Sequence, residues 1–456
     1  MGQFFGTDGI RGPVGVFPLT PEGISRIAQS AARWMMARPV PAGHPRHLVV
    51  IGSDPRAASD WIVPILSGTF SAHGIDVFPL GRFATTPEVA CETKASGATL
   101  GLAVTASHNP YTDHGMKFFA ADGFKLCGPD QDAIEAGLGV PSEAIAAPAG
   151  TGHINTVRHT PVYDRQVRAS LPARLDLRGM GLVFDAANGA AQARLANRLG
   201  KSGPWQDLLD PPIIIGAGAD GVNINDGFGA THPEALAAKV VETGAFAGVA
   251  LDGDADRLIM VDETGETVDG DQLLALLATA MQAEGRLRGG GIVATVMSNL
   301  GLERHLGGLS LSMVRAKVGD RNVVEAMRAG GFNLGGEQSG HLVLLDAATT
   351  GDGLLAALHV LSIAKADGRK FSEISRVFEP VPQKLVNVRY GGEDPLADAG
   401  VQSNIARITG DLGDNGRVLV RKSGTEPLIR IMVEAFDEAE LEDAISAIEG
   451  AVRGAA

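Results

Sequence analysis

Short apolar runs alternate with helix-like segments along the first third of the chain. Residues 47–52 (HLVVIG), 75–81 (IDVFPLG) and 100–105 (LGLAVT) have the length of buried strands, and apolar residues recur at helical spacing between them. Thr20 and Pro21 predict the start of an earlier helix, since Thr caps a helix well and Pro suits its first turn. Strands separated by helices predict right-handed crossovers and a largely parallel sheet.

The same pattern restarts after residues 143–154 (EAIAAPAGTGHI), whose small residues, Pro and Gly are typical of a linker. Residues 181–189 (GLVFDAANG) and 248–257 (GVALDGDADR) each join an apolar strand to an Asp-containing loop, as residues 47–56 do. This recurrence suggests three related α/β units. The last part differs, because it has three strand-like runs, at 384–390, 416–424 and 428–436, and a closing amphipathic helix at 438–453.

We therefore predict the α/β fold class, with three similar α/β domains of mixed, largely parallel sheets and a smaller C-terminal α+β domain. The length of 456 residues by itself suggests about three domains, and the fourth comes from the change of pattern. The expected boundaries are 1–150, 151–247, 248–369 and 370–456.

Composition and charge narrow the function classes. Hydrophobic residues make up 45% of the chain and charged residues 20%, which is ordinary for a globular protein and excludes general disorder. The formal net charge of −14 argues against a general nucleic-acid binder, which would carry a basic face. It does not exclude an anionic substrate, because a local cluster of Arg can bind phosphate on an acidic protein.

Cysteine usage and targeting signals point to one compartment. Cys91 and Cys127 have neither metal-ligand nor CxxC spacing, so a reducing cytoplasm is the simplest interpretation. No signal-peptide pattern opens the sequence, and no apolar run reaches membrane-spanning length. We therefore expect a cytoplasmic protein without a membrane partner.

Three aspartates at alternate positions form the strongest metal signal. Asp252, Asp254 and Asp256 follow an apolar strand in the sequence DGDADR, and oxygen-only ligands of this kind favour Mg²⁺ or Ca²⁺. An EF-hand is a poor alternative, because its sixth position would be Arg257 instead of Gly and its flanks are strand-like. A plain hairpin rich in Asp stays open as the other explanation.

Ser107 lies in the sequence TASHNP just beyond the predicted strand 100–105, where open α/β sheets usually bind their ligands. The GxSxG pattern of an acyl hydrolase is absent, and adjacent side chains such as Ser107 and His108 tend to diverge, so a Ser–His dyad is disfavoured. A serine beside a divalent cation can instead carry a phosphoryl group. Lys117, in HGMKFF, could supply positive charge or act as a base, or be an ordinary exposed lysine.

Two further loops have the composition of ligand sites. Residues 421–427 (RKSGTEP), followed by Arg430, combine hydroxyls, a Gly and guanidinium groups, which suit either a phosphate dianion or an exposed turn. In residues 335–341 (GGEQSGH), Glu337 and Ser339 stand two apart, and on an extended loop they would point the same way and could bind neighbouring sugar hydroxyls. A glycine-rich bend between strands explains this second loop equally well.

Taken in order, the serine loop, the DGDADR loop, the GEQSGH loop and the SGTEP loop resemble the α-D-phosphohexomutase superfamily over nearly the whole chain. Several stretches look like its bacterial phosphoglucosamine mutase subfamily. They are FFGTDGIRG near the start, DGVNINDGFGATHPE (220–234), VATVMSNLGLE (293–303), KVGDR (317–321) and GGEQSGH with Gln338. Phosphomannomutase/phosphoglucomutase relatives usually carry Met in place of Gln338 and His in place of Asp320.

The resemblance implies a role for each matching residue. Ser107 matches the phosphoserine, and Asp252, Asp254 and Asp256 match the Mg²⁺ ligands, with the serine-borne phosphate completing the shell. It also implies sugar-hydroxyl contacts at Glu337 and Ser339, a clamp for the non-reacting phosphate at Arg421, Ser423, Gly424, Thr425 and Arg430, and active-site positive charges at Lys117, Arg11 and Arg257. Lys422 departs from the subfamily, which usually has Ala or Pro there, and its charge could tighten phosphate binding.

The implied activity is that of an intramolecular phosphotransferase with one Mg²⁺ in each active site. Phospho-Ser107 would convert glucosamine 6-phosphate into glucosamine 1,6-bisphosphate, the intermediate and activator. This intermediate would turn end for end and return a phosphate to the serine, which releases glucosamine 1-phosphate toward UDP-N-acetylglucosamine and cell-wall synthesis. The resemblance further implies a central active-site cleft with one loop from each domain and a mobile last domain. Assembly as a homodimer is compatible with it.

Two other functions stay open. A phosphomannomutase/phosphoglucomutase would share both the fold and the chemistry. A catalytically silent protein that binds sugar phosphate or a cation would share the fold alone, and the intact Ser107 and aspartates argue against it. In each case the partners are small sugar phosphates, without nucleic acid.

Overall fold

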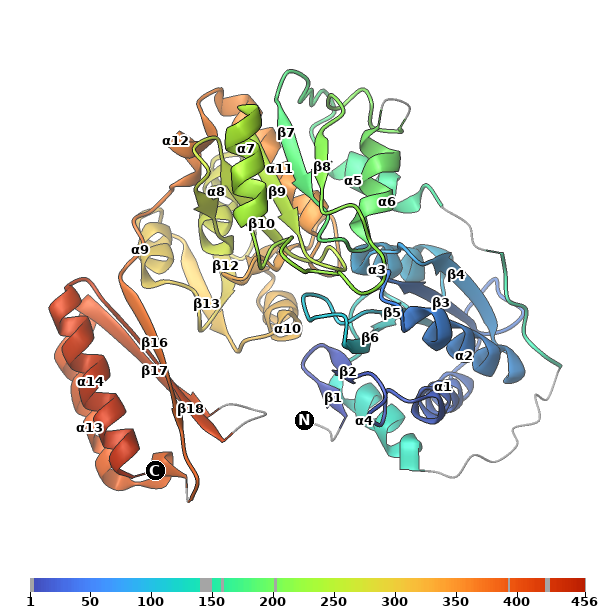
Figure 1. Cartoon of the computed structure of the whole chain (residues 1–456), viewed down its shortest axis with the longest axis horizontal. Helices are drawn as coiled ribbons and strands as arrows, with labels where there is room; N and C mark the ends of the chain where they lie inside the picture. The colour runs from blue at the N-terminus through green and yellow to red at the C-terminus, as the bar shows by residue number, and fades with distance from the viewer. Residues whose placement is uncertain are drawn as a thin grey trace.

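Over the residues that it describes, the computed structural model contains four β-sheets, each packed against helices (Figure 1). We name one domain after each sheet, in chain order, as the first, second, third and C-terminal domains. The described residues are 4–139, 150–156, 160–200, 203–392, 394–422 and 427–455.

The first domain is built on a six-stranded sheet in the order β1-β2-β6-β5-β3-β4. Its strands are β1 (Phe5–Gly6), β2 (Gly9–Pro13), β3 (Leu48–Ser53), β4 (Asp76–Gly81), β5 (Leu100–Val104) and β6 (Asp113–Ala120). Helices α1 (Pro21–Met36), α2 (Ser59–Ala72) and α4 (Gly128–Ala136), with the 3₁₀ turn η1 (Gly137–Gly139), pack on one face, and α3 (Thr86–Ser96) packs on the other. The predicted helix start is confirmed, because the Thr20 side chain accepts from the backbone N–H of Gly23 at 3.1 Å.

The strands of this sheet follow the sequence pattern only in part. β3 pairs in parallel with β4 and β5, as strands joined by helices should. β6 instead pairs antiparallel with β5 and β2, and β1 with β2. The predicted mixed sheet is therefore confirmed, with a larger antiparallel share than the alternation of strands and helices suggests. The reason is that β5–β6 and β1–β2 are hairpins, which need no crossover.

The second domain has a five-stranded sheet in the order β11-β10-β9-β7-β8. Its strands are β7 (Leu182–Asp185), β8 (Ile213–Ile215), β9 (Ala247–Leu251), β10 (Leu258–Asp262) and β11 (Thr267–Val268), and its helices are α5 (Val162–Ser170), α6 (Ala191–Leu199) and α7 (Glu234–Thr243). The expected boundary at 247/248 is corrected by this topology, because it would cut through β9, which pairs in parallel with β7. The aspartate loop therefore belongs to the second domain and not to the third.

The third domain has a four-stranded sheet in the order β13-β12-β14-β15. Its strands are β12 (Gly291–Thr295), β13 (Ser312–Ala316), β14 (Leu334–Gly336) and β15 (Leu342–Leu344), and its helices are α8 (Gly270–Ala283), α9 (Leu300–Gly308), α10 (Asp320–Gly330), α11 (Gly353–Asp367) and α12 (Phe371–Ser375). The expected start of the last domain at 370 also shifts, because Phe371 and Ile374 of α12 are buried in the core of the second and third domains.

The C-terminal domain is a three-stranded antiparallel sheet in the order β16-β18-β17 with two helices. Its elements are β16 (Gln383–Arg389), η2 (Pro395–Ala397), α13 (Ala399–Leu412), η3 (Gly413–Asn415), β17 (Gly416–Lys422), β18 (Leu428–Ala435) and α14 (Glu438–Gly454). The sequence pattern did not predict α13. The physical reason is that this helix buries only three residues, Val401, Ile408 and Leu412, so its apolar stripe is faint.

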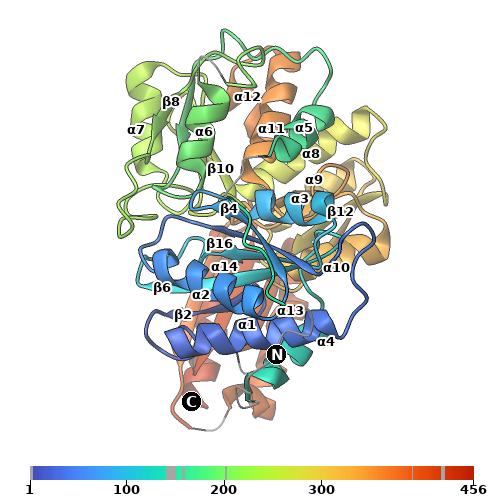
Figure 2. The ribbon, with the colours of Figure 1, turned by 90° about the vertical axis from the view of Figure 1, so that its right-hand side faces the viewer.

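Ion pairs and backbone contacts join the domains. Arg198 of α6 is buried and pairs with Glu88 of α3 and Asp164 of α5, where α3 and α5 lie side by side (Figure 2). In the C-terminal domain, Arg417 pairs with Glu434 at 2.6 Å and donates to the carbonyl of Val296 in the third domain at 2.8 Å. The first three domains thus share buried contacts, while the fourth is attached through a smaller set.

Two further expectations from the sequence concern the linker at residues 143–154 and membrane-spanning segments. Most of the predicted linker 143–154 lies outside the described residues, and where it is described, the carbonyl of His153 accepts from the N–H of Val77 on the edge strand β4 at 2.8 Å. Among the helices that the structure describes, none combines the length and the apolar character that a membrane crossing requires.

Candidate active site

Ser107 occupies a tight turn after β5 and has 1% of its surface exposed. Its φ angle of 53° lies in the left-handed region, which is uncommon for a residue with a side chain. The hydroxyl Oγ donates to Asp252 Oδ2 at 2.5 Å. The turn therefore aims the serine from the first domain at the aspartate hairpin of the second.

The same turn brings the His108 ring close to the serine, with 3.4 Å between Ser107 Oγ and His108 Nδ1. The two adjacent side chains thus do not diverge as expected, because the left-handed turn folds them together. Burial, together with the charges of Arg257 and Arg11, lowers the pKa of His108 to about 3. The ring stays neutral at physiological pH, and a 3.4 Å contact is too long for a strong hydrogen bond. A Ser–His dyad remains disfavoured.

The three aspartates converge in the hairpin between β9 and β10. One carboxylate oxygen from each of Asp252, Asp254 and Asp256 lies within 4.8 Å of the others, and all three side chains are buried. Within the described part of the chain, Asp254 Oδ1 and Asp256 Oδ1 have no hydrogen-bond partner, which is costly for a buried carboxylate unless a cation binds it. The strands on either side exclude an EF-hand. The donor set fits Mg²⁺, which prefers carboxylate oxygens.

Lys117, on β6, compensates the charge of these aspartates. It is 1% exposed, and its Nζ lies 2.7 Å from Asp254 Oδ2 and in contact with Asp256. Burial alone would lower the pKa of Lys117, but attraction to Asp254 and Asp256 outweighs burial and raises the pKa well above its usual value. The structure therefore overturns the exposed-lysine alternative. At this position its ammonium group supplies positive charge beside the aspartates.

A second layer of ion pairs surrounds Lys117, and most of its members carried no expected role. Lys125 contacts Asp8 and Asp320, and Asp320 Oδ2 lies 3.2 Å from Nε2 of His341. Burial would lower the pKa of His341, but attraction to Asp320 and Asp256 raises it to about 10. Asp8, Lys125, Asp320 and His341 come from four separate stretches of sequence, so charge pattern alone could not group them. Their sequence signal is that Asp8, Asp320 and His341 lie in the family-like motifs FFGTDGIRG, KVGDR and GGEQSGH.

The GEQSGH loop takes the second of its two expected forms, a glycine-rich bend between strands. It connects β14 and β15 through a turn in which Gly340 N–H donates to the carbonyl of Glu337 at 2.9 Å and Gly340 has a φ of 91°. Glu337 is buried and accepts from the backbone N–H of Gly319 at 2.9 Å, whereas Ser339 is exposed. The expectation of an extended loop with both side chains on one face is therefore corrected. A turn separates them because it reverses the chain between the two residues.

Three guanidinium groups expected at the site lack partners at one nitrogen. Within the described residues, Nε of Arg11, of Arg257 and of Arg430 is buried without a hydrogen-bond acceptor. Arg11 pairs through Nη2 with Asp8, and the backbone N–H of Arg257 donates to Asp252 Oδ1 at 3.2 Å. Buried donors are rarely left unsatisfied, so these groups are suited to an anionic ligand.

The C-terminal sheet presents two of the expected phosphate-clamp residues. Arg421 of β17 and Arg430 of β18 are direct cross-strand partners, an arrangement that is destabilising for like charges unless an anion lies between them. Burial and the charge of Arg430 lower the pKa of Arg421. Lys422 instead pairs with Asp394 at 2.5 Å. Because its ammonium group is engaged with a carboxylate, we do not expect it to tighten phosphate binding. Ser423, Gly424 and Thr425 lie outside the described residues.

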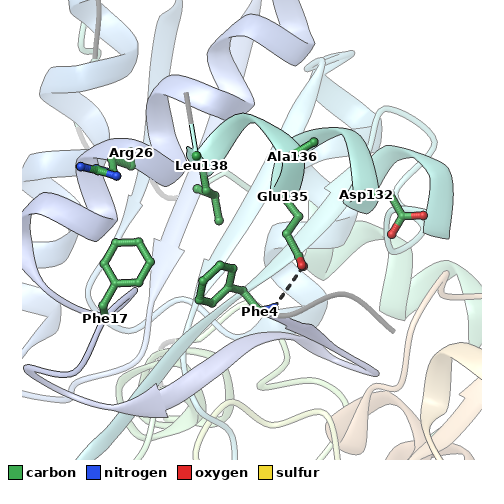
Figure 3. Close-up of a pocket in the computed structure, with 8 residues that line it drawn as sticks. Phe4, Phe17, Arg26, Asp132, Glu135, Ala136 and Leu138 are labelled. Carbon is green, nitrogen blue, oxygen red and sulfur yellow. Dashed lines mark hydrogen bonds between the residues drawn. The ribbon is translucent and has the colours of Figure 1, made fainter. Parts of the chain in front are cut away.

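A cavity of about 570 Å³ lies between the first, third and C-terminal domains. Its walls include Thr7 of the β1–β2 turn, Gln131 of α4, Lys317 and Arg321 near the start of α10, and Arg421 of β17. Thr7 precedes Asp8 and Lys317 lies three residues before Asp320, so the cavity wall includes close sequence neighbours of two members of the ion-pair network. A second cavity, of about 580 Å³, lies between α1, α4 and the segment at Phe4 (Figure 3), and none of the predicted site residues lines it.

Family models match three parts of the chain. The model described as phosphoglucomutase/phosphomannomutase, alpha/beta/alpha domain I, matches residues 2–141. The model for alpha/beta/alpha domain III matches residues 269–381, and the model for the C-terminal domain matches residues 385–451. The match that begins at residue 269 follows β11 directly, which agrees with the sheet topology.

Curated relatives match over the full length. The chain is 47% identical over 463 residues to a phosphoglucosamine mutase of Rhodospirillum centenum, covering 99% of this chain and 95% of the relative. It is 46% identical over 459 residues to a phosphoglucosamine mutase of Paracoccus denitrificans, covering 100% and 99%.

Solved structures share the fold at lower identity. A phosphoglucomutase/phosphomannomutase family protein from Burkholderia thailandensis matches with a TM-score of 0.77 and 22% identity, covering 98% of this chain and 97% of the other. An Aspergillus fumigatus N-acetylphosphoglucosamine mutase, solved in complex with GlcNAc-6P and magnesium, matches with a TM-score of 0.66 and 18% identity, covering 99% and 96%. The predicted fold class is thereby confirmed.

Proposed function

Because the chain belongs to the phosphoglucomutase/phosphomannomutase family, it is a mutase, and we propose that it interconverts glucosamine 6-phosphate and glucosamine 1-phosphate. The observation that carries the chemistry is the 2.5 Å contact between Ser107 Oγ and the first of three convergent aspartates. The name shared by full-length relatives at 46–47% identity carries the choice of sugar.

In the proposed reaction, phospho-Ser107 gives its phosphoryl group to the hydroxyl at position 1 of glucosamine 6-phosphate. The bond from phosphorus to the serine oxygen breaks, a bond to the sugar oxygen forms, and the proton lost by the sugar hydroxyl is balanced by the proton that the serine oxygen gains. The resulting 1,6-bisphosphate turns over, and Ser107 takes back the phosphoryl group from position 6. Lys117 and Arg11 contribute positive charge beside the transferring group, which is the main requirement of phosphoryl transfer.

We propose Mg²⁺ as the cation that Asp252, Asp254 and Asp256 hold. Their buried oxygens are suited to a hard divalent ion, and two of them lack other partners among the described residues. When bound, Mg²⁺ would neutralise charge on the transferring phosphate. We also propose cytoplasmic action, which suits the free thiols of Cys91 and Cys127, and assembly as a homodimer.

The substrate clamp lies in the C-terminal domain. Arg421 and Arg430 face each other across two strands, and Arg421 lines the 570 Å³ cavity, whose volume is typical of small-ligand sites. The clamp must accept either phosphate of the intermediate, because the intermediate binds in two orientations. Glu337 and Ser339 are proposed to bind the sugar hydroxyls. We propose that this domain moves as the intermediate turns. Such a movement would have to break contacts with the third domain, which among the described residues include the hydrogen bonds from Arg417 to the carbonyls of Val296 and Ser298.

Arg421→Ala tests the clamp. We expect it to raise the KM for glucosamine 6-phosphate by about 10- to 100-fold, because a charged hydrogen bond to phosphate is worth about 1.5–3 kcal/mol. Steady-state kinetics measure this effect. Lys422→Ala is the matched control: it removes a neighbouring charge that is paired with Asp394, so the KM should stay near that of the wild type. Equal effects of the two substitutions would contradict the clamp.

A coupled assay tests the substrate. We expect a higher kcat/KM for glucosamine 6-phosphate than for glucose 6-phosphate or mannose 6-phosphate. A clear preference for glucose or mannose phosphates would make the protein a phosphomannomutase/phosphoglucomutase instead. Binding of sugar phosphate without turnover of any of the three would support the non-catalytic alternative.

A further inference from the structure

We infer that Arg56 and Asn225 are positioning residues that set the place of the Ser107 hydroxyl by holding the backbone of its loop from two domains. The inference rests on the proposed function, since it concerns how the serine reaches its phosphoryl partner. It predicts that residues without contact to substrate or to the aspartate carboxylates control the rate of phosphoryl transfer.

Arg56 holds the serine loop from within the first domain. Its side chain is completely buried, and Nε donates to Asp54 Oδ2 at 2.9 Å. Nη2 donates to the carbonyls of Ser107 at 2.9 Å and Asn109 at 2.7 Å. Nη1 donates to two more carbonyls, that of Pro110 in the same loop and that of Asp113 at the start of β6. A buried guanidinium with four carbonyl acceptors along one loop and the strand that follows it fixes the path of that loop, because its donors form a rigid fork.

Asn225 holds the same loop from the second domain. Its Nδ2 donates to the carbonyl of Ser107 at 2.9 Å and of Asn109 at 3.2 Å, and its side chain is 6% exposed. The residue adopts a φ of 61°, which Asn tolerates better than most side chains. Its own backbone N–H donates to the carbonyl of Ala187 at 2.8 Å, which ties it to the loop after β7.

The aspartate hairpin packs against this junction. A Cβ atom on Gly253 would lie 2.6 Å from the carbonyl oxygen of Ser107 and 3.0 Å from Nδ2 of Asn225. The serine loop, Asn225 and the aspartate loop therefore meet with no room for a side chain at position 253. The carbonyl of Ser107 thus accepts one hydrogen bond from each domain at the point where the two loops touch.

This arrangement has a kinetic consequence. Ser107 is held at a left-handed φ, a conformation that persists only when its surroundings impose it. Loss of one donor should let the hydroxyl move, and a shift of about 1 Å in a reacting group costs up to about 100-fold in rate. Substrate contacts stay intact, so the loss should appear in kcat and not in KM.

Asn225→Gly is the first test, because Gly removes the amide and accepts the positive φ without strain. Asn223→Gly is the matched control. Asn223 lies in the same loop and makes hydrogen bonds within it, to Gly218 and Asp220, but none of its described bonds goes to Ser107. The probe is glucosamine 1,6-bisphosphate, and the rate at which Ser107 gains a phosphate is followed by intact-mass analysis beside steady-state kinetics.

In Asn225→Gly, we expect both the rate at which Ser107 gains phosphate and kcat to be about 10- to 100-fold lower than in the wild type. The KM should stay within about threefold of the wild-type value. Asn223→Gly should match the wild type in rate at a similar melting temperature. If both Gly variants lose the same rate, or neither does, the positioning role of Asn225 is refuted.

Arg56→Lys is the second test. Lys keeps the charge beside Asp54 but cannot span the four carbonyls, so kcat should fall at nearly constant KM. A lower melting temperature with an unchanged kcat would assign Arg56 to stability alone. A wild-type protein that never gains phosphate on Ser107 would overturn the proposed function instead, so the two failures are distinguishable.

Discussion

Ser107→Ala is expected to abolish mutase turnover, lowering kcat by at least about 1,000-fold, as removal of a covalent nucleophile does in other enzymes. The hydroxyl is the group that lies 2.5 Å from the aspartate hairpin, and no second serine contacts the three aspartates among the described hydrogen bonds. Intact-mass analysis after incubation with glucosamine 1,6-bisphosphate should show one added phosphate on the wild type and none on the variant.

The fold of this variant should remain intact, because the substitution removes only the hydroxyl contacts to Asp252 and His108 and leaves the backbone contacts of the loop in place. Its melting temperature is therefore the control for misfolding. A well-folded Ser107→Ala protein that kept full turnover would refute the covalent mechanism and would reopen the assignment of the nucleophile.

Lys117→Met is expected to produce the largest loss of stability. In the absence of Mg²⁺, we expect the free energy of unfolding to fall by about 3–5 kcal/mol, because the substitution leaves buried carboxylates without their compensating charge. Lys117 contacts both Asp254 and Asp256 and is 1% exposed. Chemical denaturation in the presence of a chelator measures this effect.

Added Mg²⁺ should stabilise Lys117→Met more than the wild type, because a bound cation replaces the missing ammonium and binding stabilises the folded state by linkage. Lys384→Met is the control: it breaks an exposed pair with Glu442 and should change stability by less than about 1 kcal/mol. If Mg²⁺ stabilised wild type and Lys117→Met equally, Lys117 and the cation would not compensate the same carboxylates.

Local patterns predicted the elements on which the site is built. The run 100–105 became β5, the helical spacing between the predicted strands 75–81 and 100–105 became α3, and the DGDADR sequence became a hairpin that gathers three carboxylates. These predictions held because strand and helix periodicity and turn chemistry depend on residues close in sequence. Helix α13 was missed because its apolar stripe is faint and leaves no strong local pattern. At GEQSGH the glycine-rich bend between strands was one of two interpretations, and local sequence alone could not choose between it and an extended loop.

Domain boundaries needed the tertiary structure. The apolar run at residue 248, where a new domain was expected to begin, is strand β9, which pairs with β7 in the sheet of the second domain. Strand pairing between distant segments is a long-range property, and an apolar run alone does not say which sheet it joins. The match to the family model of domain III begins at residue 269, which is the boundary that the strand pairing also indicates.

The sequence by itself determined the chemistry that is available: a serine after a strand, three alternate aspartates, and arginines near the end of the chain. Only the tertiary structure decided which groups act together. It brought Ser107 of the first domain to Asp252 of the second, buried Lys117 between carboxylates, and placed Arg56 and Asn225 on one carbonyl. The physical reason is that residue type sets which bonds a group can make, while burial and distance between remote segments decide which bonds it does make.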